Sequence, residues 1–126
     1  MMNGEKQKNW DIRERSFKYA LRAIKLYQCL QAGKDGAGWI IAKQYLRSAT
    51  SIGANVEEAQ SGESRADFIH KYSIAQKEAR ESLYWLRLLA ESGLIPNKRL
   101  IALIGETEEL ISVITAIIVS AKQNKA

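Results

Sequence analysis

Residues 64–91 read SRADFIHKYSIAQKEARESLYWLRLLAE, and this stretch decides the fold. Its apolar residues recur in alternating steps of three and four, which is the spacing of a helix that buries one face in a bundle. The members of this stripe are Phe68, Tyr72, Ala75, Ala79, Leu83 and Leu86. Ser64 stands three residues before Asp67, where its hydroxyl can cap a free amide of the first turn. The pattern therefore predicts a helix that begins after Ser64 and ends near Glu91, before Gly93.

Three further helices are expected around this one, because breaks at 33–38, 61–64 and 93–97 separate long periodic segments. We expect helices over 11–31 and 37–60, and a last one that opens with Pro96 and continues to about residue 122. The fold class is therefore all-α. The four helices form one domain over 11–122, with a flexible basic segment at 1–10 and a short tail at 123–126.

Apolar stripes identify the faces that these helices bury. On the first helix the stripe comprises Ile12, Ala20, Ala23, Ile24, Tyr27 and Leu30, and on the second it comprises Ile41, Tyr45, Ala49, Ile52 and Val56. The centre of the second helix, 48–54, has small side chains except at Ile52, so a neighbouring helix could approach it closely.

The last helix is more apolar than one buried face requires. Its core stripe comprises Leu100, Leu103, Ile104, Thr107, Leu110, Ile111, Ile114, Ile118 and Ala121. Val113, Ala116 and Val119 add apolar surface outside that stripe, and residues 110–121 contain no charge. We expect this extra surface to be covered by other copies of the chain in a homo-oligomer.

Composition limits the possible classes of protein. The 126 residues suit a single domain, and the single cysteine, Cys29, cannot form an internal disulfide. No run approaches the roughly 20 apolar residues of a membrane span, and the first ten residues lack the apolar stretch of a signal peptide. We therefore expect a cytoplasmic protein with no membrane partner.

The positive charge is concentrated near the start of the chain. Of the formal net charge of +5, residues 1–32 contribute most, with seven basic groups against three acidic ones. The basic residues of this segment are Lys6, Lys8, Arg13, Arg15, Lys18, Arg22 and Lys25, with Trp10 and Tyr19 between them. Cations of this kind can meet backbone phosphates while an exposed ring stacks on an unpaired base. We take Arg13, Arg15, Lys18, Arg22 and Lys25 as candidate RNA or DNA contacts; the alternative is an ordinary solvated face.

Two polar groups are candidates for a subunit interface. On the second helix, Arg47, Ser51, Asn55 and Glu58 share a side away from the core stripe, and on the third, Glu78 and Glu81 border Trp85. Arg47 is available as a forked donor to a carboxylate. With Val113 and Val119 of the last helix, these residues form the predicted subunit contact. Solvated faces remain the alternative.

The residue types for enzyme chemistry are scarce. The chain has one histidine, His70, and one cysteine, with no ligand spacing for zinc and no inward Glu-x-x-His pair for a di-metal site. Gly33, Gly36 and Gly38 join two helices, with no preceding strand to make a phosphate loop. We therefore expect no metal, no cofactor and no catalytic residue.

The central part of the chain resembles a known family. Residues 47–60, RSATSIGANVEEAQ, together with 64–89, closely resemble the bacterial four-helix bundle proteins that are also called the 23S rRNA intervening-sequence (S23) family. The likeness is specific over 45–92, weaker over 11–122 and absent from the first ten residues. The matching positions are Ser51, Asn55, Glu58, Asp67, Phe68, Lys77, Glu78, Glu81, Trp85 and Leu86, whereas Ala59 stands where many relatives have glycine.

This resemblance implies an antiparallel up-and-down bundle that assembles as a homopentameric ring, with a function that is poorly defined in the family. A similar pentameric bundle is the accessory protein of diversity-generating retroelements, where it binds nucleic acid and a reverse transcriptase. The resemblance supplies no catalytic role for any residue. The leading hypothesis is a non-enzymatic oligomer that binds RNA or DNA through its basic first helix. The alternative is a scaffold whose protein partner docks on the Trp85 face or at 33–38.

Overall fold

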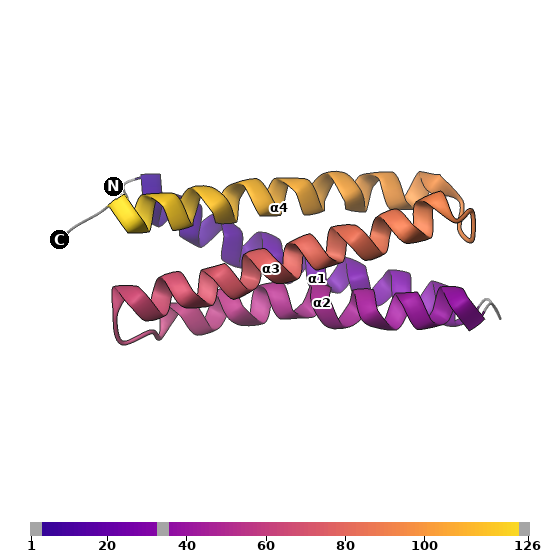
Figure 1. Ribbon diagram of the computed structural model, residues 1–126, viewed down its shortest axis with the longest axis horizontal. Coiled ribbons are helices and arrows are strands. Elements are labelled where there is room, and N and C mark those ends of the chain that lie inside the picture. Colours follow the sequence, from indigo (N-terminus) through magenta and orange to yellow (C-terminus); the bar gives the residue numbers. More distant parts are fainter. Residues whose placement is uncertain (1–3, 33–35, 124–126) are drawn as a thin grey trace.

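Four long helices make up the described part of the chain, and each runs antiparallel to the next (Figure 1). The computed structural model describes the backbone of residues 4–32 and 36–123 and the side chains of 11–31 and 36–123. The helices are α1 (Gly4–Ala32), α2 (Gly36–Gln60), α3 (Arg65–Glu91) and α4 (Asn97–Gln123). The predicted all-α four-helix bundle is confirmed.

Most helix ends fall where the sequence signals place them. The Ser64 hydroxyl accepts a hydrogen bond from the backbone amide of Asp67 at 3.1 Å, which confirms the predicted N-cap of α3. Past the other end of α3, Gly93 adopts a φ of 73°, a conformation that glycine tolerates best. The exception is α1, which begins at Gly4, seven residues before the predicted start.

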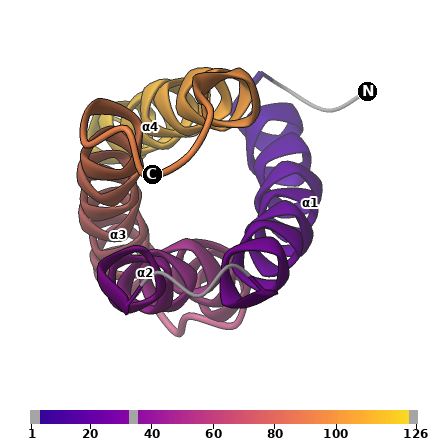
Figure 2. The same ribbon diagram turned by 90° about the vertical axis from the view of Figure 1, so that its right-hand side faces the viewer.

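The four helices occupy the corners of a square, with α1 diagonal to α3 (Figure 2). Small residues allow α2 to approach both of its neighbours. A side chain built at Gly53 would lie 3.4 Å from Ser16 of α1, and the hydroxyls of Ser48 and Ser82 lie 2.8 Å apart across the contact with α3. The expectation that the centre of α2 permits close packing is therefore confirmed. By contrast, α1 packs least extensively against α4.

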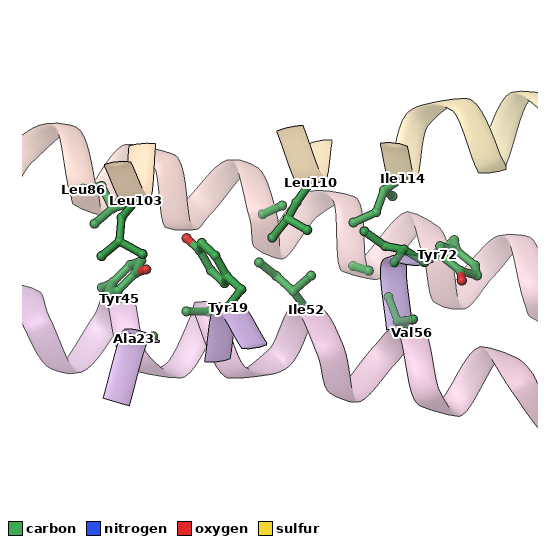
Figure 3. Packing of buried hydrophobic residues seen from close by; sticks show 14 of the residues in the cluster. Tyr19, Ala23, Tyr45, Ile52, Val56, Tyr72, Leu86, Leu103, Leu110 and Ile114 are labelled. Atoms are coloured by element: carbon green, nitrogen blue, oxygen red, sulfur yellow. The ribbon is translucent and has the colours of Figure 1, made fainter. Parts of the chain in front are cut away.

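The core contains three fully buried tyrosines, Tyr19, Tyr45 and Tyr72 (Figure 3). The rings of Tyr19 and Tyr45 meet edge to face with centroids 6.3 Å apart. Burial raises the pKa of all three hydroxyls, that of Tyr72 to about 12, because a phenolate is poorly solvated there. Leu103, Leu110 and Ile114 of α4 close the core from the opposite side.

The buried face of α1 differs from the predicted one. The side chains that α1 buries are Ile12, Ser16, Tyr19, Ala23 and Leu26, whereas Ile24 is 40% exposed. The prediction was wrong about Ile24 because apolar residues occupy two sides of this helix. Tyr19 and Ser16, which have polar groups, lie on the inner side.

A single copy of the chain buries more of the apolar surface of α4 than the sequence predicted. Ile117 is fully buried, and Val113 and Ala116 are half-buried, so among the three residues outside the predicted stripe only Val119 is exposed. The uncharged run of α4 therefore does not by itself require a second copy. Over the described residues, no helix combines the length and the apolar character needed to cross a membrane.

Two isoleucines of α4 test the assignment of its inner and outer faces. Ile114 is fully buried and Ile101 is 65% exposed. Ile114→Ala should lower the free energy of unfolding by about 2–5 kcal/mol because it leaves a cavity in the core. Ile101→Ala, the matched control, should change it by less than about 0.5 kcal/mol. Urea unfolding followed by circular dichroism measures both, and equal losses would show that the face is misassigned.

Candidate nucleic-acid interface

The orientation of α1 about its own axis determines which of the candidate residues face solvent. Tyr19, expected as an exposed ring for stacking on a base, is fully buried, and its hydroxyl lies 2.5 Å from the Thr107 hydroxyl of α4. That prediction is therefore wrong: the tyrosine hydroxyl has a polar partner inside the core, so the ring can be buried at little cost. The side chains of Lys6, Lys8 and Trp10 lie outside the described residues.

Three of the five candidate cations on α1 are engaged by carboxylates. Arg13 donates two hydrogen bonds of 3.1 Å to Glu57 of α2. Arg15 donates two, of 3.2 and 2.9 Å, to Glu106 of α4, and Lys18 pairs with Glu14 at 3.1 Å within α1. The hydrogen bonds raise the pKa of both guanidinium groups. Arg13 and Arg15 thus link α1 to α2 and to α4, and the charge of all three cations is balanced by a carboxylate.

The other two cations are left free. Among the described residues, no carboxylate pairs with Arg22 or Lys25, and both are exposed. They lie on the side of α1 that faces α4, where Arg99 also reaches the surface and donates from Nη1 to the Cys29 thiol at 2.6 Å. These three cations surround a depression of about 280 Å³ whose floor includes Leu26 and Leu103.

Arg99 was missed in the sequence, although a signal was present. Lys98 and Arg99 follow Pro96 at the start of α4, and in an up-and-down bundle the start of α4 lies beside the end of α1. Arg22 and Lys25 of α1 and Arg99 of α4 therefore line one depression from two helices, and we call these three residues the cation triad.

The polar residues predicted for a subunit interface are satisfied largely within one chain. Arg47 donates to Glu78 of α3 at 3.4 Å and also to Glu81, so its predicted role as a forked donor is met across the α2–α3 contact. The indole of Trp85 donates to Glu81 at 3.1 Å. The structure thus brings the two predicted polar groups together at one place. Their role in a contact between subunits stays a prediction.

The remaining interface candidates are dispersed. Asn55 donates to the backbone carbonyl of Ser51 at 2.8 Å, and Glu58 accepts from Lys71 of α3 at 2.7 Å. Val113 lines the α1–α4 seam, and Val119 is 47% exposed.

An apolar stripe on α1 was not anticipated as an exposed surface. Phe17, Leu21 and Ile24 are 65%, 47% and 40% exposed and follow one another in steps of four and three, so they share one side of the helix. Arg22 lies away from this side, whereas Lys25 follows Leu21 by one turn and borders the stripe. The outer surface of α1 therefore presents an apolar stripe and a basic stripe next to each other.

Potential metal ligands are dispersed over the described residues. In the part of the chain that the structure describes, no three His, Cys, Asp or Glu side chains are grouped so that they could hold a metal ion. His70 lies in the second turn of α3, whereas Cys29 lies in the last turn of α1.

Comparison with known proteins leads to one family, both by sequence and by structure. The family model described as 23S rRNA-intervening sequence protein matches residues 8–116. Among solved structures, the fold is similar to that of a protein of unknown function from the S23 ribosomal protein family of Bacteroides thetaiotaomicron VPI-5482. The two chains share 38% sequence identity with a TM-score of 0.80, over 85% of this chain and 97% of the other. No curated protein matches.

The free energies of unfolding of two arginine variants test the division between paired and free cations. The Arg15–Glu106 pair is partly buried, with side chains 36% and 23% exposed. Arg15→Gln should lower the free energy of unfolding by about 1 kcal/mol because Glu106 loses its partner. Arg22→Gln, the control on the same helix, should change it by less than about 0.5 kcal/mol. Urea unfolding at pH 7 measures both variants, and a larger loss for Arg22→Gln would contradict the assignment.

Proposed function

The chain belongs to the family of 23S rRNA-intervening sequence proteins, and from this premise we propose that it is a non-enzymatic, oligomeric bundle that binds RNA or DNA without sequence specificity. The name of the family refers to an intervening sequence of 23S rRNA. The observation that carries the proposal is the cation triad, Arg22, Lys25 and Arg99, which lacks carboxylate partners among the described residues.

The binding proposed is electrostatic. Cations that replace the counterions of a nucleic-acid backbone gain affinity from counterion release and read no bases. An aromatic ring for base stacking is not supplied by Tyr19, because it is buried. The triad therefore supports contacts to phosphates rather than to bases, which favours binding without sequence specificity.

Assembly would multiply this weak patch. The exposed stripe of Phe17, Leu21 and Ile24 is the apolar surface that we assign to the contact with a second copy. Arg22 lies away from the stripe and Arg99 belongs to α4, so these two cations stay available when the stripe is covered, while Lys25 borders the contact. In a ring, each copy would repeat the triad, and several weak contacts to one strand would add as avidity. The pentameric state rests on the family resemblance.

The positions of His70 and Cys29 support a non-enzymatic role. His70 lies near the start of α3 and Cys29 near the end of α1, so this histidine cannot act as the base for this thiol. We place the protein in the cytoplasm, where an exposed thiol such as that of Cys29 stays reduced.

A second candidate function is a scaffold for a protein partner. It is favoured by a patch that includes Tyr84 and Leu88 of α3, 57% and 37% exposed, beside the half-buried Trp85. The rings of Tyr84 and Trp85 meet edge to face at 5.1 Å. A pull-down that resists nuclease, together with no shift of labelled RNA, would favour this function over nucleic-acid binding.

Nucleic-acid binding is tested by removing the triad. The variant Arg22→Gln/Lys25→Gln/Arg99→Gln should bind a labelled single-stranded RNA more weakly. The slope of its log affinity against log salt concentration should be smaller in magnitude by up to about 2, because each lost phosphate contact removes about 0.7 from that slope. Fluorescence anisotropy between 50 and 300 mM salt measures this. The control Lys77→Gln/Arg80→Gln lies on α3, diagonal to α1, and should keep the slope. A wild-type affinity that does not change with salt would contradict the mechanism.

Assembly is tested by mass in solution. Light scattering at micromolar concentration should give a multiple of 14.2 kDa for the wild type. Leu21→Lys should reduce that mass, because a charge in the apolar contact is costly to desolvate. Gln44→Lys, on an exposed position of α2, is the control and should assemble normally. A folded wild-type particle of 14.2 kDa would rule out the oligomer.

A further inference from the structure

We propose that the depression enclosed by the cation triad is a site for a phosphomonoester, the dianionic phosphate found at the end of a nucleic-acid strand or on a free nucleotide. The inference rests on the proposed function in assigning the ligand to a strand end. It adds a preference for that end over internal phosphates.

Two helices build this depression with regular spacing. Arg22, Lys25, Leu26 and Cys29 stand at steps of three, one and three on α1, so they share one face, and Arg99 and Leu103 stand one turn apart on α4. The cavity of about 280 Å³ is smaller than most drug-sized pockets and suits a phosphate with its attached sugar. Leu26 and Leu103, each 4% exposed, provide an apolar floor for that organic part.

The hydrogen bond between Arg99 and Cys29 positions one of the cations. A thiol is a weak acceptor, so it orients the guanidinium without neutralising it. The other N–H groups of Arg99 can still form a forked contact with phosphate oxygens.

A second depression on the same seam provides an internal comparison. It is lined by Asp11, Glu14, Arg15, Lys18 and Val113, so two acids balance its two bases. Among the described residues, none that lines the triad depression is acidic. Two depressions of similar size thus differ in charge, and an anion would be attracted to the one near the end of α1.

The charge of the triad favours a dianion. Three clustered cations repel one another while the site is empty, and a ligand with more negative charge relieves that repulsion more fully. A phosphomonoester carries about 1.5 to 2 negative charges at pH 7, whereas an internal phosphodiester carries one. The strand end is therefore the better ligand.

The test compares two RNA oligonucleotides of one sequence, one with a 5′-phosphate and one with a 5′-hydroxyl. The phosphorylated strand should bind about tenfold more tightly, as expected for added charge-assisted hydrogen bonds. Arg99→Gln should abolish that preference. Lys18→Gln, in the neighbouring depression, should retain it. Equal affinity of the two wild-type complexes would overturn the inference and leave the salt-dependent binding of the proposed function intact.

The chain's single cysteine reports occupancy directly, because Cys29 lines the depression and is exposed. The 5′-phosphorylated strand and AMP should each slow alkylation of Cys29 by iodoacetamide, and the 5′-hydroxyl strand should need about tenfold higher concentration for the same protection. Protection by AMP without binding of either strand would support the phosphomonoester site with a free nucleotide as its source, and would contradict the proposed function. Protection by the 5′-hydroxyl strand with none by AMP would overturn the site.

Discussion

The orientation of α1 is the constraint on which the surface of this protein depends. Tyr19 fills the core beside Tyr45 and meets Thr107 of α4 through its hydroxyl, which combines a large buried area with a satisfied polar group. With Tyr19 directed inward, the helical repeat determines the direction of the other described side chains of α1, residues 11–31. Arg13 and Arg15 are directed to carboxylates on either side, while Arg22 and Lys25 face solvent near α4.

Ion pairing converts a uniformly basic segment into a localised basic site. The sequence shows basic residues spread over the first helix, yet much of their charge is balanced by Glu57, Glu106 and Glu14. Arg22 and Lys25 have no carboxylate partner among the described residues, and they meet Arg99 at the seam with α4. The neighbouring apolar stripe of α1 shares no residue with the triad, so assembly and phosphate binding can be altered by separate substitutions.

The fold was largely predictable, whereas the site was predictable only in part. Ser64, Gly93 and Pro96 act through local backbone chemistry, so the helix ends that they mark can be identified without knowledge of the packing. The inner face of α1 was not identifiable in this way, because apolar side chains occupy two of its sides and only contacts with α2 and α4 choose between them. Likewise, the partners of Arg13 and Arg15 come from distant segments, and the role of Arg99 depends on topology.

Hydroxyl-radical footprinting, read residue by residue by mass spectrometry, tests the orientation of α1 most directly. An inward Tyr19 predicts that this ring is protected in the native protein and is labelled only after unfolding. Tyr84, which is 57% exposed, provides the comparison within the same sample. Labelling of native Tyr19 at the rate of Tyr84 would contradict the orientation of α1, and with it the separation of its cations into paired and free groups.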